Sequence, residues 1–403
     1  MRRDELGRRA QRLAQEFGLD GAGIQFFRIP QITMQELATY GFLGRYGHWS
    51  RGKTYHRTRM QANLGLQRFY EVIVNTEPPQ AYVLEGNGAI EDVTVMAHVA
   101  GHADFFRQNL WMQGLAEGAA RRLPLHRRRL QEYGARYGER PLEETLDRAL
   151  LLEQYCAPFG PEDVLGAVAR GGAALQGWQR NCLEIVREEG IYFRAQQRTK
   201  ILNEGWATFW HLRIMRALDL APGEYVEFAT LHSQIVALAP GRFNPYALGL
   251  AMLEEIAADY GAGPGGDAPR EALEALFAVR RYEDDAAFLR NHLTQQVVDR
   301  LELFLRRGEA GGRAATVEEA RDALLLAVGG GSRPQVEVEQ ADAGLTLRLR
   351  HLHDGRDLDL PEAEAVLGEI QAMWGAPVQL ETAAAGQRLV LRHDGGAVTR
   401  RTE

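Results

Sequence analysis

The sequence predicts a mainly α-helical protein with a small β element and a separate small α/β domain at its C-terminal end. Three observations lead to this fold class: helical spacing of apolar residues over most of 90–328, short β-rich segments before it, and a Gly-rich linker, Gly329–Pro334, followed by alternating polar and apolar residues. The expected domains are therefore residues 1–262, a helical extension and linker over 263–333, and a C-terminal domain over 334–403.

Near the N-terminus, residues 1–20 have the spacing of an amphipathic helix, and the aromatic, Gly-rich segment Tyr40–Tyr55 is typical of a loop. Residues 66–76 and 81–85 are rich in β-branched and aromatic residues and flank Pro78-Pro79. We expect them to form two strands joined by a turn.

The segments that follow are expected to be helices, because apolar residues recur every three or four positions. They cover residues 90–114, 115–158, 174–218, 222–239, 246–260 and, after a flexible break at Gly261–Pro269, 270–328. Beyond the linker, period-two alternation predicts strands at 335–339, 345–351, 377–382 and 387–393, with a helix at 361–374. This order predicts a small ββαββ domain.

Composition and charge restrict the functional classes. Hydrophobic residues make up 45% of the chain and charged residues 25%, as in ordinary globular proteins. The net charge of −7, with both signs spread along the chain, argues against a nucleic-acid surface, and the basic run Arg121–Arg129 is interpreted as a solvated helix face. There is no bilayer-spanning apolar stretch or signal peptide, and Cys156 and Cys182 lie outside any CxxC pattern. We therefore expect a cytoplasmic protein with no membrane span.

The first candidate site lies within residues 93–112. His98 and His102 are four residues apart, so on a helix their side chains share one face and can bind one metal ion. The zinc-protease motif HExxH uses the same spacing. A pair of core histidines held by hydrogen bonds is the alternative that the spacing alone leaves open.

The second candidate segment covers residues 199–211. Glu204 follows Asn203 in an apolar stretch, and His211 lies two turns further along the same helix face. A buried carboxylate is costly unless it is paired or ligated. Glu204 therefore needs a partner, which a metal ion or an Arg or Lys side chain would supply equally well. His211 is a candidate for a fourth metal ligand or for a hydrogen-bond donor outside the ligand shell.

Together, the two segments resemble the paired active-site helices of the gluzincin aminopeptidases, in which a V-x-A-H-E-x-x-H helix precedes a helix with N-E-G-F-A. The corresponding strings here are Val95–His102 and Asn203–Ala207. The resemblance implies a zincin-like helical core in which His98, His102 and Glu204 hold a divalent metal ion and leave a position open for water or substrate. Zinc is the first expectation, with iron or manganese as alternatives for the same ligands.

Two features depart from these peptidases. Val99 stands where they carry the glutamate that deprotonates the metal-activated water, and about 100 residues separate His102 from Glu204, which demands a helical insertion. Hydrolysis would therefore need another base. Glu85, at the end of the second expected strand, is the first candidate, and Asp104, which is equally suited to orient His102, is the second.

Four further polar residues stand among apolar or aromatic neighbours: His48, Tyr192, His232 and Asn244. A lone histidine beside tryptophan, as at His48, is more often a satisfied core residue than a ligand. Core packing is also the expected role of Tyr192, although its hydroxyl could serve as an oxyanion donor. Asn244 precedes a proline and is expected to cap a helix.

A series of longer motifs resembles the SpoVR family (stage V sporulation protein R). They are Ala38–Gly41, His48–Lys53, Phe69–Asn75, Ala81–Asn87, Ala97–Asn109, Tyr192–His211 and Asn244–Gly249. The resemblance covers roughly residues 15–262. It implies a bacterial protein of sporulation or stress response, which tends to accompany a serine protein kinase and a von Willebrand-type domain protein.

Three functional hypotheses follow. The first is a metal-dependent hydrolase that acts on a peptide or amide bond, with a cell-wall precursor as one candidate substrate. The second is a non-catalytic scaffold or regulator that recruits a kinase or another partner through residues 335–403, and Val99 favours it. The third is a non-heme iron or manganese protein with the same ligand face. Nucleic-acid binding is not expected.

Overall fold

The computed structural model describes residues 2–21, 23–42, 45–50, 71–156, 162–238, 243–263, 268–303, 315–328 and 333–402. Outside these ranges fall residues 51–55 of the expected loop, 66–70 of the first expected strand, 264–267 of the expected break and 329–332 of the linker. The chain forms two compact units from discontinuous stretches: Met1–Pro124 with Gln196–Gly329, and Leu125–Ala195 with Gly330–Glu403.

The first unit contains a three-stranded sheet in the order β1-β3-β2, preceded by α1 (Arg2–Glu16). β2 (Glu71–Val74) and β3 (Gln80–Leu84) form the expected antiparallel pair. β1 (Gln25–Ile29) pairs in parallel with β3 and was not predicted, nor was α2 (Gln31–Tyr40). A parallel pairing between strands some 50 residues apart has no local signature, because the neighbour of a strand is set by the tertiary fold.

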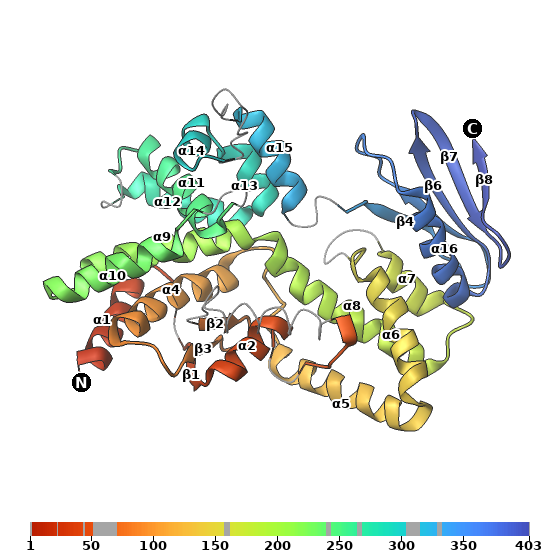
Figure 1. Ribbon diagram of the computed structural model, residues 1–403, viewed down its shortest axis with the longest axis horizontal. Coiled ribbons are helices and arrows are strands. Elements are labelled where there is room, and N and C mark those ends of the chain that lie inside the picture. Colours follow the sequence, from red (N-terminus) through yellow and green to blue (C-terminus); the bar gives the residue numbers. More distant parts are fainter. Residues whose placement is uncertain are drawn as a thin grey trace, which may run out of the picture. The chain divides into compact units, whose positions relative to one another are not determined.

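Helices make up the rest of the first unit (Figure 1). α9 (Lys200–Ala217) packs against α4 (Ala89–Gln108) on one side and α11 (Pro245–Asp259) on another. Both α4 and α9 are buried almost all round, so their polar residues lie in the core. The helices α10 (Pro222–Ile235), α12 (Arg270–Tyr282), α13 (Asp285–His292), α14 (Gln295–Arg300) and α15 (Val317–Ala327) complete this unit.

Glycines allow α4, α9 and α11 to approach closely. A Cβ atom added at Gly205 of α9 would lie 2.4 Å from Cα of Gly249 in α11. One added at Gly101 of α4 would lie 2.7 Å from Cα of Ala207 in α9. Both distances are far below van der Waals contact, so the side-chain-free residue is required at each crossing. This close packing brings the polar residues of α4 and α9 within reach of one another.

The second unit joins a helical segment to the C-terminal domain. It includes most of α5 (Ala119–Tyr137) and α8 (Gly177–Arg198), together with α6 (Glu139–Glu153) and α7 (Val164–Gly171). The single helix expected over 115–158 is therefore divided. α5 and α6 meet at Gly138, whose φ of 98° lies in a region that favours glycine.

The C-terminal domain has the expected ββαββ order, extended by one strand into a five-stranded sheet. β5 pairs in parallel with β6 across the helix α16, and the other neighbours are antiparallel. The elements are β4 (Val336–Gln340), β5 (Leu347–His351), α16 (Leu360–Trp374), β6 (Val378–Ala384), β7 (Gln387–His393) and β8 (Thr399–Thr402). The β8 sequence TRRT has no apolar residue, so alternation could not reveal it.

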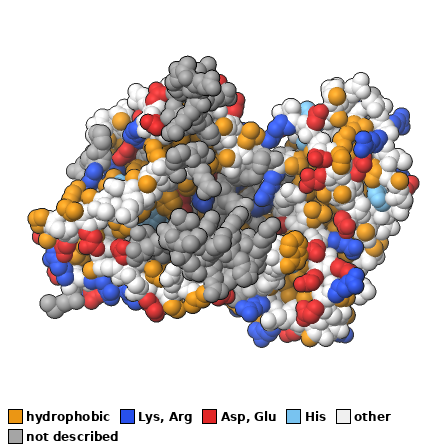
Figure 2. Space-filling model, in the orientation of Figure 1, with side chains coloured by type: hydrophobic (Ala, Val, Ile, Leu, Met, Phe, Trp, Pro, Cys, Tyr) orange, Lys and Arg blue, Asp and Glu red, His pale blue; other side chains and the backbone are white. Residues whose placement is uncertain are grey.

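The expected fold class, mainly α with a small β element and a β-rich C-terminal domain, is confirmed. No helix within the described ranges combines the length and the hydropathy that a bilayer-spanning segment needs. On the face seen in Figure 2, basic and acidic side chains are interspersed.

Candidate metal centre

His98 and His102 lie together in the core on one face of α4. Their rings meet edge to face, with centroids 4.6 Å apart, and the two Nε2 atoms are 3.1 Å apart. The side chains are only 8% and 5% exposed. Two imidazole nitrogens therefore face one point inside the first unit.

Glu204 of α9 reaches the same point. Its Oε2 atom lies 3.4 Å from Nε2 of His102 and 3.7 Å from Nε2 of His98, and its side chain is 18% exposed. These separations are too long for good hydrogen bonds, and Oε2 is buried with no hydrogen-bond partner among the described residues. The carboxylate is thus held beside the imidazoles without being satisfied by them.

Glu71 of β2 is a further member of the cluster, and the sequence reasoning did not identify it. One oxygen of its carboxylate and one nitrogen each of His98 and His102 lie within 4.8 Å of one another. Its Oε2 atom, like that of Glu204, is buried and lacks a hydrogen-bond partner within the described part of the chain. The four side chains come from three separate elements, β2, α4 and α9.

The strand alternation explains why Glu71 points inward. Residues two apart share one face of a strand, so Glu71 lies on the face of Ile73. Ile73 packs on the apolar cluster that includes Val95 and Val99 of α4. Val99 is fully buried there, so the position of the peptidase glutamate serves the core in this chain. A carboxylate opening the apolar strand EVIV was the available signal for Glu71.

Asn203 fixes the orientation of His102. Its Oδ1 atom lies 2.8 Å from Nδ1 of His102. Because an amide oxygen can only accept, Nδ1 carries the hydrogen, and Nε2 is the nitrogen whose lone pair faces the cluster when the ring is neutral. This is the arrangement in which a histidine binds a metal ion.

His211 and His232 continue the network behind His98. Nδ1 of His98 is 3.0 Å from Nδ1 of His211, and Nε2 of His211 is 2.9 Å from Nδ1 of His232 in α10. With a lone pair on Nε2, His98 donates to His211, which in turn donates to His232. Burial and the nearby His98 and His232 hold the pKa of His211 well below its ordinary value, so its ring is neutral. His211 therefore contacts the outer side of His98.

Opposite influences act on the two carboxylates. Burial raises the pKa of Glu71, against the effect of His98 and His102. Burial acts in the same direction on Glu204, but the adjacent imidazoles of His102 and His98 outweigh it and hold its pKa well below the ordinary value. Burial opposes the charging of His102, whereas Glu204, Glu71 and Asn203 favour it and raise its pKa. Neighbouring carboxyl groups with separated pKa values are typical of sites that transfer protons.

Tyr246 of α11 completes the surroundings of the cluster. Its ring stacks against His98 with centroids 5.9 Å apart. Burial, followed by the charges of Glu204 and Glu71, raises the pKa of the Tyr246 hydroxyl well above its ordinary value, so it remains a donor. Asn244 caps α11 as predicted, and its Oδ1 accepts from the Tyr246 amide at 2.9 Å.

The distances in the cluster fit a metal ion. With bonds of about 2.0–2.1 Å, two ligand atoms lie about 3.3 Å apart in a tetrahedral site and about 3.0 Å apart in an octahedral one. The separations among Nε2 of His98, Nε2 of His102 and Oε2 of Glu204 are 3.1, 3.4 and 3.7 Å. Two buried carboxylate oxygens that no described residue hydrogen-bonds also favour a cation. Imidazole and carboxylate ligands suit zinc, iron and manganese.

The two predicted bases lie elsewhere. Asp104 accepts hydrogen bonds from Nε1 of Trp206 and from the Asp20 amide, both at 2.9 Å, and pairs with Arg280 at 3.4 Å. It thereby joins α4 to α9 and α12. Glu85 follows the last residue of β3, and its side chain is exposed to solvent.

The last two predicted residues make local contacts. His48 is buried, with its ring 5.4 Å from that of Trp49 and its Nδ1 atom 2.8 Å from Oγ of Ser50. Tyr192 is buried in α8, in the second unit, with its ring 4.9 Å from that of Phe193.

The fold and the cluster define a mainly helical protein with a buried group of histidines and glutamates whose spacing suits a metal ion. The chain matches the family model described as SpoVR like protein over residues 4–162 and 157–322, and the model described as SpoVR-like C-terminal domain over 334–385. It therefore belongs to the SpoVR-like family. It is 27% identical to the uncharacterized protein YcgB of Escherichia coli (strain K12) over 450 aligned residues, which cover 88% of this chain and 87% of YcgB. No solved structure gives a significant match.

Proposed function

We propose that the protein is a metal-dependent hydrolase whose ion is held by His98, His102 and Glu204, with Glu71 as the general base. One observation carries this proposal: two carboxylate oxygens are buried, with no hydrogen-bond partner among the residues that the structure describes, beside two histidine nitrogens 3.1 Å apart. Buried carboxylates cost free energy unless a proton donor or a cation compensates them, and a divalent cation would compensate both.

The chain's own residues prepare the ligands for this role. Asn203 holds His102 in the required tautomer, and the contacts from His98 to His211 and from His211 to His232 are compatible with the same tautomer in His98. A bound divalent cation would polarise a substrate carbonyl and a water molecule as a Lewis acid.

Glu71 supplies the base that the histidine motif lacks. Val99 replaces the peptidase glutamate and packs in the apolar core. Glu71 arrives from β2 instead, and its oxygen lies within 4.8 Å of the nitrogens of His98 and His102. There it can accept a proton from the attacking water and return it to the leaving group. By the resemblance to the gluzincins, the proposed substrate is a peptide or amide bond, in a sporulation, stress or cell-envelope pathway.

Hydrolysis is tested with a defined peptide mixture, whose cleavage is followed by mass spectrometry. We expect cleavage that is lost when the protein is stripped of metal and restored by zinc, manganese or iron(II). The Glu71→Gln variant should keep its metal and lose about 10²–10⁴-fold in rate. Glu85→Gln, which changes an exposed carboxylate, is the control and should keep both the bound metal and the cleavage rate. A fully active Glu71→Gln variant contradicts the assigned base, and metal-loaded protein that cleaves none of the peptides contradicts the hydrolase.

A non-catalytic scaffold is the alternative, and the packing of Val99 in the apolar core favours it. In this case the helices remain as architecture, and residues 335–403 bind a partner such as a serine kinase. The scaffold predicts protein that contains no metal even after reconstitution, together with partner binding that is lost when residues 335–403 are deleted. Iron or manganese, in place of zinc, would be identified by elemental analysis of the same protein.

A further inference from the structure

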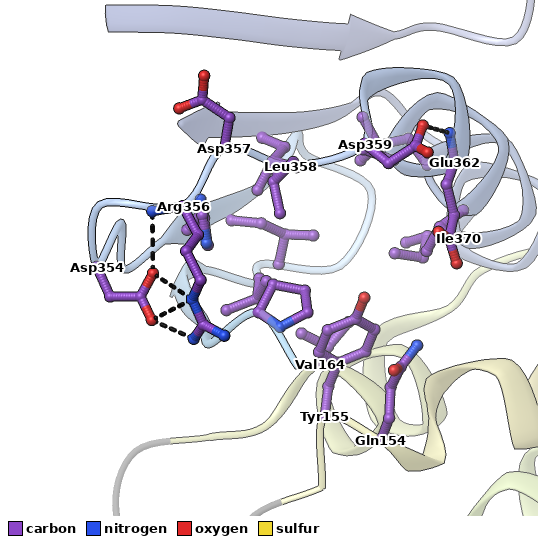
Figure 3. Close-up of a pocket in the computed structure, with 18 residues that line it drawn as sticks. Gln154, Tyr155, Val164, Asp354, Arg356, Asp357, Leu358, Asp359, Glu362 and Ile370 are labelled. Atoms are coloured by element: carbon purple, nitrogen blue, oxygen red, sulfur yellow. Dashed lines mark hydrogen bonds and ion pairs between the residues drawn. The ribbon is translucent and has the colours of Figure 1, made fainter. Parts of the chain in front are cut away.

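The second unit contains a cavity of about 320 Å³ that none of the predicted site residues lines (Figure 3). Leu349 of β5 and Leu380 of β6 form an apolar floor, and Leu367 and Ile370 of α16 form one wall. Val164, at the start of α7, lies on the other side. All five side chains are buried, so the cavity is lined by the hydrophobic core of this unit.

A single buried polar ring lies in the floor. Side chains alternate along β5, so His351 shares the buried face of Leu349. Nδ1 of His351 lies 2.9 Å from Oγ1 of Thr382, which satisfies one side of the ring inside the sheet. Burial lowers the pKa of His351, so the floor carries no positive charge.

The rim of the cavity is acidic. Its charged members are Asp354, Arg356, Asp357, Asp359 and Glu362. Arg356 is already paired with Asp354, since its Nε lies 3.1 and 3.0 Å from the two carboxylate oxygens. Asp359 caps α16 by accepting from the Glu362 amide at 3.2 Å, so the helix end is also satisfied. An excess of negative charge therefore remains on the rim.

The negative charge is concentrated on one side. Figure 3 shows Asp357, Asp359 and Glu362 along one side of the cavity, with Gln154 and Tyr155 across from them. The amide of Ala385 and the ring of His353 donate to the two oxygens of Asp357 and hold its pKa below the ordinary value. Asp357 therefore adds negative charge to the rim, but its oxygens already have partners in the protein.

We propose that this cavity binds a small organic amine, with its apolar body on the floor of Leu349 and Leu380 and its ammonium group beside Glu362 on the acidic rim. The volume lies at the lower end of the range for ligand sites, about 300–1,000 Å³, which suits a body the size of one large side chain. The acidic rim selects a cation over an anion of the same shape. The proposal does not depend on the metal site, which lies in the other unit.

Three probes of one shape and different charge test this proposal on the full-length protein: tryptamine (cationic), tryptophol (neutral) and indole-3-propionate (anionic). Binding is followed by ligand-detected NMR titration. We expect saturable binding of tryptamine, binding of tryptophol that is about fivefold weaker, and no binding of the acid. Equal binding of all three, or no saturable binding of tryptamine, would overturn the proposal.

Two matched pairs of variants locate the site. Ala363 lines the cavity and Ala365, on the same helix, is exposed, so Ala363→Phe should abolish tryptamine binding and Ala365→Phe should not. Glu362→Gln should remove the preference for tryptamine over tryptophol. Glu364→Gln should leave that preference intact, because Glu364 pairs with Arg400. Each variant is first checked for an unchanged thermal unfolding transition. Binding that survives in folded Ala363→Phe refutes the assigned cavity.

Discussion

Buried carboxylates are satisfied to different degrees at Asp163 of the second unit and at Glu71 and Glu204 of the first. In the second unit, the carboxylate of Asp163 accepts from the Gly166 amide at 2.8 Å and from Nε of Arg187 at 2.7 Å, and so serves only to cap and fasten α7. In the first unit, Glu71 and Glu204 each keep a buried oxygen with no partner within the described residues. One buried carboxylate is therefore satisfied by the fold, and the other two are not satisfied by the described residues.

This difference is informative because polarity alone does not mark a site. A buried carboxylate at a helix start, with a guanidinium beside it, needs nothing from outside the chain. A carboxylate that lies against two imidazole nitrogens and keeps a buried oxygen without a partner among the described residues is one that a cation would stabilise. Three sets of variants test the tight helix packing, the orientation of the ligands, and an ion pair whose partners all lie in the second unit.

The largest effect is expected from the helix crossing beneath the cluster. In Gly205→Val, the new Cβ would lie 2.4 Å from Cα of Gly249, so α9 and α11 must separate. We expect a loss of about 3 kcal/mol or more in the free energy of unfolding, measured by urea denaturation. The control is Gly223→Ala in α10, where nothing lies within 4 Å of the added atom. It should be neutral or up to about 1 kcal/mol more stable. Equal stability of the two variants would refute the packing argument.

An intermediate effect is expected at Asn203. Leucine at this position removes the acceptor for Nδ1 of His102 and leaves the tautomer of that ring undetermined. We expect Asn203→Leu to bind its metal about 10–100-fold more weakly in a chelator competition assay. Asn203→Asp keeps an acceptor and should restore most of the affinity. If both variants bind metal equally well, Asn203 does not orient the ligand.

The smallest effect is expected at His126, which forms an ion pair with two carboxylates of the second unit. Nδ1 of His126 lies 3.3 Å from Oε1 of Glu189, and Nε2 lies 3.4 Å from Oε2 of Glu188. Burial lowers the pKa of His126, but these carboxylates outweigh it and raise it to about 9. The pKa of His126 in the folded protein exceeds its value of about 6.5 in the unfolded chain. The ion pair therefore stabilises the folded state fully below pH 6.5, and this stabilisation is lost as the pH rises through 9.

We therefore expect His126→Gln to lower the free energy of unfolding by about 1 kcal/mol at pH 6 and by much less at pH 10. Urea denaturation of wild type and variant at the two pH values measures this difference. A loss of the same size at both pH values would show that packing, not charge, is the contribution of His126.

Local patterns of apolar residues in the sequence were sufficient to predict most of the fold. The helices that carry His98 and Glu204 follow from helical spacing, and the C-terminal strands follow from alternation. Local sequence patterns were insufficient where a segment takes its structure from pairing with a distant part of the chain. The segment Gln25–Ile29 forms a strand because it pairs with β3. The segment Thr399–Thr402 has no apolar residue, and it forms β8 because it pairs with the edge of β7.

The candidate site was predicted in part for the same reason. His98, His102 and Glu204 could be paired because they lie in two recognisable helical strings. Glu71 was missed: it opens an apolar strand, but only the packing of β2 on α4 shows that its carboxylate points inward. The anchor of α9 is equally non-local: the carboxylate of Asp285 accepts from two amides of the first turn of α9, both at 2.9 Å.

The most direct test of the metal centre is the metal content of purified protein, measured by plasma mass spectrometry on wild type and Glu204→Gln. Glu254→Gln is the matched control, because Glu254 is also 18% exposed in the first unit but pairs with Arg300. We predict about one zinc, iron or manganese ion per chain in wild type and control, and loss of that ion in folded Glu204→Gln. No metal in reconstituted wild type, or full occupancy in Glu204→Gln, would contradict the metal centre.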